Sequence, residues 1–171
     1  MSDPVETAWQ GKWIAVKTQG KWEYVSRTRG TRAVVIVAVD DDDQVLLIDQ
    51  YRVPLARRCI ELPAGLVGDD LADDTPEKAA VRELEEETGH TAARVEILGE
   101  FQSSPGLVTE GFTLTRAHGL TRIGEGGGLD GEDIVVHRVP LADVPAFVAA
   151  KRAEGKAIDV KLLLLLASTL L

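Results

Sequence analysis

The order of the predicted elements indicates an α+β sandwich, in which many short strands are covered by a few helices. Three observations support this fold class. Runs of β-branched residues alternate with turn residues over the first part of the chain, an amphipathic helical pattern spans residues 76–88, and two more helical patterns close the chain. The length of 171 residues and the apolar fraction of 44% predict one globular domain covering residues 1–171.

Five strands are predicted ahead of the helix at 76–88. The turn Thr18-Gln19-Gly20 separates the first two. Four consecutive aspartates at 40–43 separate the third and fourth, and a run of adjacent like charges favours a hairpin turn over a cation site. The five predicted strands cover residues 12–16, 21–27, 33–39, 44–51 and 58–62.

The helix predicted at 76–88 has a signal at each end. Thr75 can cap the N-terminus ahead of Pro76 at the first helical position, and Gly89 can adopt the positive φ that ends a helix. An apolar side for packing on a sheet comes from Ala79, Ala80, Val81 and Leu84. Strands at 95–102, 113–120 and 133–138 and helices at about 141–153 and 159–170 are predicted after it.

Three carboxylates share one face of this helix, since Glu83, Glu86 and Glu87 stand at i, i+3 and i+4. Like charges at this spacing repel, and a divalent cation reverses the sign of that cost. A solvated acidic surface is the alternative, but a short capped helix with its acids late favours a metal site. We expect Glu87 to face solvent and Arg82 to pair with Glu85 or Glu86 on the next turn.

Charge and cysteine content narrow the class of protein. The net charge of −9 argues against a nucleic-acid polymer as partner, because no basic stripe can displace counterions. Cys59 is the single cysteine, so no intrachain disulfide can form; it is expected in the core, and a reducing, cytoplasmic location is expected. We find no N-terminal signal, and the apolar run 162–171 is too short to span a bilayer, so no membrane partner is expected.

A motif accounts for the carboxylates. The run Arg82-Glu83-Leu84-Glu85-Glu86-Glu87-Thr88-Gly89 resembles the second half of a Nudix box, although His90 departs from its aliphatic last position. The lead-in Glu61-Leu62-Pro63-Ala64-Gly65 also resembles the family. The loop glycine is either Gly68, which fits the spacing, or Gly65, which requires an insertion in residues 68–73. The resemblance implies a Nudix-type α/β/α sandwich with a mixed β-sheet.

Segments outside the box are similar to the ADP-ribose pyrophosphatase branch of that family. They are Gln50-Tyr51-Arg52-Val53-Pro54, Ser104-Pro105-Gly106 and Thr109-Glu110. The branch implies hydrolysis of the pyrophosphate bond of a nucleoside diphosphate derivative with Mg²⁺ or Mn²⁺, ADP-ribose giving AMP and ribose 5-phosphate. Two alternatives stay open: a GDP-mannose or other nucleotide-sugar pyrophosphatase, and a non-catalytic domain that senses a nucleotide. The intact carboxylate set argues against the sensor.

The resemblance also implies the catalytic residues. The metal ligands would be the backbone carbonyl of Ala64 together with Glu83, Glu87 and Glu132, and Glu86 and Arg82 would have catalytic roles beside them. The glycine-rich segment 124–133 would be a mobile loop that closes over substrate and supplies the base. Glu132 is the first choice for the base and Asp130 the second.

The substrate contacts implied by the branch come from several segments. Arg27 and Arg52 would grip the diphosphate, since a guanidinium donates to two oxygens at once. An N-terminal β-segment, about 10–30, would build a homodimer and supply two tryptophans that sandwich the adenine. Those tryptophans are Trp13 and Trp22, and Leu66, Ser104 and Gly106 would line the ribose and phosphates. The alternative places both tryptophans in a core or dimer interface and both arginines in surface ion pairs; Trp9 has no assigned role.

Overall fold

The computed structural model describes residues 3–29, 32–68 and 73–170, which form three sheets and three α-helices. An N-terminal sheet has the order β1 (Glu6–Gln10), β2 (Ile14–Gln19), β3 (Trp22–Arg27). A second sheet has the order β10 (Val135–Pro140), β5 (Gln44–Arg52), β6 (Arg57–Glu61), β11 (Ala157–Ile158). The third has the order β7 (Ala64–Val67), β4 (Arg32–Ala38), β9 (Gly111–Arg122), β8 (His90–Gln102). The helices are α1 (Pro76–Thr88), α2 (Val144–Ala153) and α3 (Leu163–Leu170).

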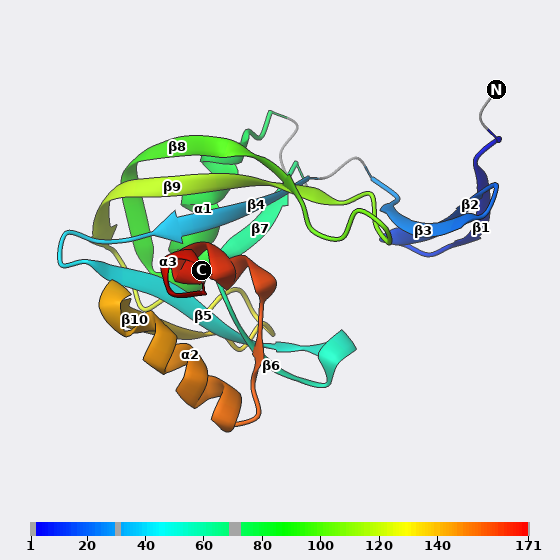
Figure 1. Cartoon of the computed structure of the whole chain (residues 1–171). Coiled ribbons are helices and arrows are strands. Elements are labelled where there is room, and N and C mark those ends of the chain that lie inside the picture. The colour runs from blue at the N-terminus through cyan, green and yellow to red at the C-terminus, as the bar shows by residue number, and fades with distance from the viewer. Residues whose placement is uncertain (1–2, 30–31, 69–72, 171) are drawn as a thin grey trace.

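Strands β4 and β5 are buried on both faces and form the middle layer of a sandwich (Figure 1). Because successive strand residues point to opposite faces, each strand contributes to two cores. One core packs against α1 and contains Val34, Ile36, Ala38, Leu46, Ala79, Ala80, Leu84 and Ala117. The other packs against α2 and α3 and includes Val35, Val45, Leu47, Ile60, Leu62, Val144, Val148, Leu162 and Leu166. The predicted α+β fold is confirmed, with helices on both sides of the sheets.

Both central sheets mix strand directions. Strand β4 runs parallel to β9 but antiparallel to β7, and the short β11 runs parallel to β6 while the other pairs in that sheet are antiparallel. The mixed strand pairing implied by the family resemblance is therefore present, divided between two sheets that each contribute to both cores.

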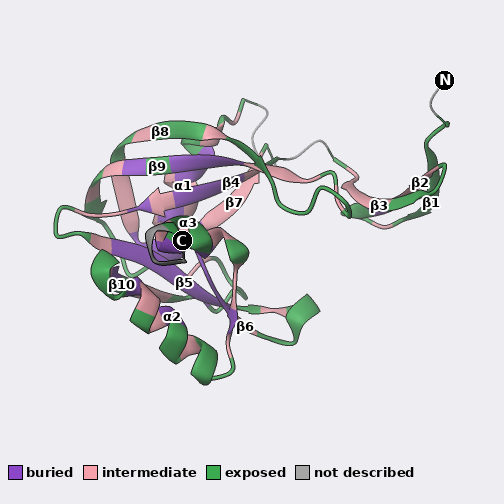
Figure 2. Ribbon diagram, in the orientation of Figure 1, coloured by how far each residue is buried: buried purple, intermediate pink, exposed green. Residues whose placement is uncertain are grey.

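The N-terminal sheet extends away from this body (Figure 1). Strand β1 is exposed throughout, whereas β2 and β3 are mostly half-buried (Figure 2). Its link to the body is a loop after β8: the Val25 N–H donates to the Leu107 carbonyl at 2.8 Å, and the Thr109 N–H donates to the Val25 carbonyl at 3.0 Å. The predicted strand 12–16 is displaced, because β2 covers Ile14–Gln19, and β1 was not predicted.

The predicted bounds of the carboxylate helix are confirmed. The Thr75 hydroxyl accepts from the Lys78 N–H at 3.3 Å, and Gly89 has φ +70° with its N–H on the Glu85 carbonyl. The predicted loop at Pro63-Ala64-Gly65 is corrected, since Ala64–Val67 pairs with β4 as β7. Strand β8 starts at His90 instead of residue 95, and 3₁₀ turns at Leu141–Asp143 and Val160–Leu162 precede α2 and α3.

Two smaller predictions concern single segments. Cys59 lies in the core as expected, and burial raises the pKa of its thiol to about 12. Residues 69–72, which belong to the predicted insertion, fall outside the described residues. Within the described part of the chain, every helix falls short of the length and apolar character needed to cross a membrane.

Candidate active site

A cavity of about 230 Å³ opens where β5, β7, α1 and the loop before β10 meet. It brings together predicted residues from four separate segments. Its lining consists of Gln50, Arg52, Ala64, Gly65, Leu66, Arg82, Glu83, Glu86, Glu87, Leu129 and Glu132. Glu132 is in this lining and Asp130 is not, so the geometry favours Glu132 over Asp130 for a role here. We call this space the acidic cavity.

Glu87 is the deepest carboxylate of the acidic cavity. It is 4% exposed, and its Oε2 accepts a hydrogen bond from the Ala64 N–H at 2.9 Å. The expectation that Glu87 faces solvent is wrong, because β7 covers this side of α1. Burial, with the like charges of Glu83 and Glu132, raises the pKa of Glu87 to about 8 despite the Ala64 hydrogen bond.

Gly65 is the glycine against which the Glu83 side chain of α1 packs. A Cβ atom at this position would lie 1.9 Å from Glu83 Cδ, so the Glu83 side chain occupies the space that any other residue would fill. Gly68 has φ +80°, and a Cβ there would meet no atom within 4 Å. This contact favours Gly65 over Gly68 as the loop glycine of the motif. Burial also raises the pKa of Glu83.

Arg82 ties the helix to β7. Its Nη1 donates to Glu83 Oε1 at 2.6 Å, and its Nη2 donates to the Leu66 carbonyl at 2.9 Å. Glu86 Oε2 lies 3.7 Å from Nη1, so the expected pairing on the next turn involves Glu86. Pairing with Glu85 is not observed, because Glu85 accepts from the Thr91 hydroxyl at 2.6 Å instead.

The glycine-rich loop is fastened to the end of α1. The Gly127 N–H donates to the Glu87 carbonyl at 2.9 Å, and the Gly128 N–H donates to the Glu86 carbonyl at 3.0 Å. Positive φ at its glycines lets the loop backbone satisfy helix carbonyls that would otherwise lack a donor. Closure of the loop over substrate stays a prediction. Glu132 Oε2 accepts from the Leu129 N–H at 2.7 Å.

The acidic cavity offers the ligands that a hard divalent cation prefers, because the atoms available to coordinate it are carboxylate, carbonyl and amide oxygens. Gln50 adds a buried Oε1 without a hydrogen-bond partner in the described part of the chain. Among the described residues, no three acidic, histidine or cysteine groups are already gathered as a metal-binding set. Glu83, Glu87 and Glu132 each accept from a donor of the protein instead, so a cation would replace those bonds. The residue types fit Mg²⁺.

Arg52 has a partner that the sequence analysis missed. Its Nε and Nη2 donate to the two carboxylate oxygens of Glu61 at 2.6 and 2.9 Å, and the Glu61 side chain is 6% exposed. This fork holds the guanidinium at the edge of the acidic cavity. The signal that could have predicted this buried ion pair is Glu61, a charged residue inside the otherwise apolar run 59–62.

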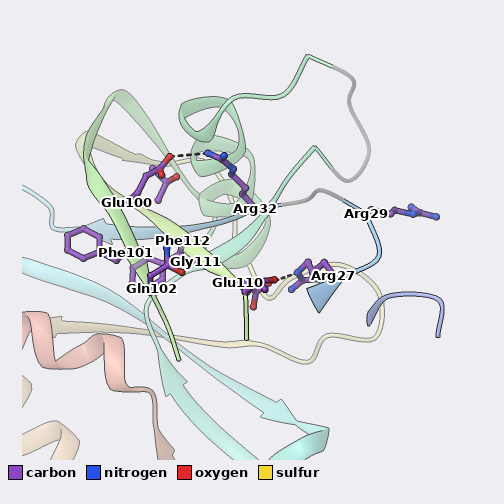
Figure 3. Close-up of a pocket in the computed structure, with 11 residues that line it drawn as sticks. Arg27, Arg29, Arg32, Glu100, Phe101, Gln102, Glu110, Gly111 and Phe112 are labelled. Carbon is purple, nitrogen blue, oxygen red and sulfur yellow. Dashed lines mark hydrogen bonds and ion pairs between the residues drawn. The ribbon is translucent and has the colours of Figure 1, made fainter. Parts of the chain in front are cut away.

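Arg27 lies outside the acidic cavity. It pairs with Glu110 beside a separate cavity of about 280 Å³, which Arg29, Arg32 and Phe101 also line (Figure 3). The structure therefore does not bring Arg27 together with Arg52 within one chain.

Trp22 lines a third cavity of about 330 Å³ with Tyr24 and Gly106. Ser104 closes the same loop, since its carbonyl accepts from the Leu107 and Val108 N–H groups. This part of the predicted substrate site is assembled within one chain, but away from the acidic cavity.

Trp13 stands at the other end of the β2–β3 hairpin from Trp22. Trp22 pairs with Gln19, whereas the Trp13 carbonyl accepts from the N–H of Thr28, which is six residues after Trp22 and just past the end of β3. At the rise of an extended strand this separates the backbones of the two tryptophans by about 20 Å. A single chain therefore cannot stack both rings on one purine. Lys12 Nζ lies 4.4 Å from the centre of the Trp13 ring.

The fold and the acidic cavity together define an α+β protein with an oxygen-rich site suited to a divalent cation. Comparison with known families agrees: the model of the NUDIX domain matches residues 29–159, and the chain belongs to the Nudix family. The predicted family and its resemblance to the ADP-ribose pyrophosphatase branch are confirmed.

The relatives have different functions. A methanol dehydrogenase activator of Bacillus methanolicus is 37% identical over 70% of this chain and 64% of its own length. An ADP-ribose pyrophosphatase of Bacillus subtilis is 36% identical over 70% of this chain and 63% of its own length. A GDP-mannose pyrophosphatase of Citrobacter koseri is 34% identical over 76% of this chain and 71% of its own length. The chain thus spans just under two thirds of the first two relatives.

A solved structure described as an ADP compounds hydrolase superimposes with a TM-score of 0.74 over 99% of this chain and 93% of that chain, at 22% identity. At this identity the likeness concerns the fold. It covers nearly the whole length of both chains, the N-terminal sheet included.

Proposed function

We propose that this protein hydrolyses the pyrophosphate bond of a nucleoside diphosphate derivative, with ADP-ribose giving AMP and ribose 5-phosphate. The observation that carries the proposal is the acidic cavity, where carboxylates of α1 and the loop before β10 face the guanidinium groups of Arg52 and Arg82. Similarity to an ADP-ribose pyrophosphatase supports the substrate class.

The carboxylates of the acidic cavity would bind the metal and accept a proton. Glu83, Glu87 and Glu132, with the backbone carbonyl of Ala64, would hold Mg²⁺ or Mn²⁺, and Glu86 stands beside them. The cation would neutralise the diphosphate and activate a water for attack on phosphorus. Glu132 would take the proton of the attacking water.

The two cavity arginines have distinct tasks. Arg52 is held by Glu61 at the cavity edge, where its remaining donors can bind phosphate oxygens. Arg82 fixes Glu83 and β7 relative to each other, which keeps the carboxylates in one place. Leu66 accepts one of these Arg82 bonds through its carbonyl, and it also lines the cavity.

A homodimer is part of the proposal. The N-terminal sheet stands apart from the body and exposes Trp9, Trp13 and Trp22 at 56, 48 and 65%. A second copy would cover this apolar surface. It would also allow Trp22 and Gly106 of one copy, with Ser104, to meet Trp13 and the acidic cavity of the other. We further propose one domain and a cytoplasmic location, the latter supported by the single buried cysteine.

The test is incubation of the purified chain with ADP-ribose and Mg²⁺, followed by separation of AMP and ribose 5-phosphate. Production of both, abolished by chelation, is the expected result. GDP-mannose is run in parallel, because GDP-mannose pyrophosphatases are also relatives. A much higher kcat/KM for GDP-mannose would shift the assignment to that sugar nucleotide. Tight binding of ADP-ribose without product would indicate a nucleotide sensor.

A further inference from the structure

The loop that carries Glu132 is held at a second point by an arginine on β6. Arg58 Nη1 donates to Asp133 Oδ2 at 2.8 Å, and Arg58 Nη2 donates to the Asp133 backbone carbonyl, also at 2.8 Å. Asp133 is the residue directly after Glu132 and has φ +48°, a left-handed conformation that is uncommon for non-glycine residues and is favoured when neighbouring contacts hold it. Two bonds from one guanidinium supply that hold.

Arg58 is itself held in place by the buried carboxylate of Asp49. Its Nε donates to Asp49 Oδ1 at 2.8 Å, and the Asp49 side chain is 1% exposed. Lys156 also donates to this carboxylate, and His137 Nε2 lies 3.8 Å from its other oxygen. A buried carboxylate with two cationic partners anchors the Arg58 stem, so the outer edge of the guanidinium is presented to the loop in one orientation.

The two ends of the loop are therefore tied to different layers of the sandwich. Gly127 and Gly128 bind the end of α1, and Asp133 binds β6 through Arg58. The Ile134 N–H closes the base of the loop on the Gly127 carbonyl at 3.1 Å. Glu132 sits between the two ties, in a turn closed by its own N–H on the Leu129 carbonyl at 3.1 Å.

We propose that Arg58 is a positioning residue, which keeps Glu132 in the acidic cavity by clasping the backbone and side chain of Asp133. The inference rests on the proposed function for its kinetic consequence. Its structural consequence, an ordered loop from Gly127 to Ile134, does not depend on the substrate.

The first variant is Asp133→Asn, which keeps the backbone contact and removes the charge of a side chain that is 80% exposed. We expect kcat to fall about 10-fold, since small displacements of a catalytic group reduce turnover strongly. KM and Tm should stay at the parent values. The matched control is Asp42→Asn, an equally exposed aspartate, 77%, that pairs with Arg138 at 2.6 Å beyond the acidic cavity; its kcat should match the parent.

The second variant is Arg58→Lys, which keeps a positive charge near Asp49 but cannot bind Asp133 at two atoms with a fixed fork. It should lower kcat at least as much as Asp133→Asn. In the background of Glu132→Gln neither change should reduce kcat further, because residues that act through one group are not additive.

Hydrogen exchange of the folded chain provides a readout without substrate. The amides of Gly127, Gly128 and Ile134 should exchange faster in Asp133→Asn and Arg58→Lys than in the parent or in Asp42→Asn. Parent-like exchange together with parent-like kcat in Asp133→Asn would overturn the inference. If the parent hydrolyses no nucleoside diphosphate derivative, the proposed function fails, and the exchange data alone then decide whether Arg58 holds the loop.

Discussion

Glu87 and Ala64 are joined directly: the carboxylate of α1 accepts the backbone N–H of the first residue of β7 at 2.9 Å. Both were predicted to be metal ligands, Glu87 through its side chain and Ala64 through its carbonyl. The bond shows how the two segments are held against each other before any cation arrives, and it accounts for the burial of Glu87.

Replacing Glu87 with glutamine should abolish most turnover. The amide is nearly isosteric but carries no charge, so a cation loses a ligand that the carboxylate would supply. We expect kcat to fall by at least about 100-fold, more than the loss of an outer partner of a ligand typically causes. The measurement is ADP-ribose hydrolysis at saturating Mg²⁺. Activity within a few-fold of the parent would contradict the assignment of Glu87 as a ligand.

The raised pKa of Glu87 predicts that the stability of the metal-free protein depends on pH. The folded pKa of Glu87 is raised from about 4.5 to about 8, so between these values the folded state holds a proton that the unfolded chain has lost. The stability that this proton contributes is present below the lower value and is lost as pH rises through the upper one.

In the presence of a chelator, Glu87→Gln should therefore have a higher Tm than the parent at pH 8.5, by at least about 2 °C, with a smaller difference at pH 5. Added Mg²⁺ should stabilise the parent more than the variant, since ligands of the native state raise its stability. Glu125→Gln, at a loop side chain that is 91% exposed, is the control and should follow the parent. Identical pH profiles for Glu87→Gln and the parent would show that Glu87 is ionised in the fold.

Gly65→Ala should reduce activity through Glu83. The added methyl would lie 1.9 Å from Glu83 Cδ, so the carboxylate must leave its position beside Arg82. We expect a kcat loss of about 10-fold to 100-fold, the scale at which a misplaced group acts. Gly124→Ala is a matched control, because its Cβ would approach no atom closer than 4.0 Å. The two variants are compared by ADP-ribose kinetics and by Tm.

Trp22→Ala should weaken substrate binding. Stacking of a base on an aromatic ring contributes about 1–3 kcal/mol, which predicts an increase in KM of about 5-fold to 150-fold. Sedimentation of the same sample measures the oligomeric state and separates stacking from assembly. Trp9→Ala is the comparison, since Trp9 is similarly exposed but belongs to no predicted binding position. Equal KM for the parent and Trp22→Ala would remove Trp22 from the site.

Local signals predicted α1 most accurately. Thr75, Pro76 and Gly89 fixed both of its ends, because capping is decided by neighbouring residues in the chain. Strand β7 was missed for the opposite reason: Pro63 and Gly65 resemble a turn locally, and only pairing with β4 makes the segment extended. The same holds for the two-residue β11, which exists through β6 alone.

The sequence by itself determined the family, the sandwich fold and the set of carboxylates on α1, since all three follow from residue types at short, fixed spacings. The tertiary structure alone decided that Glu87 is buried, that Arg52 binds Glu61, and that the loop of Glu132 is tied to α1 and β6. The Arg52–Glu61 pair joins neighbouring strands at a separation of nine residues, and the other two relations join residues 23 and 75 positions apart. Their partners are chosen by which layers pack together, and packing depends on the whole core rather than on any local pattern.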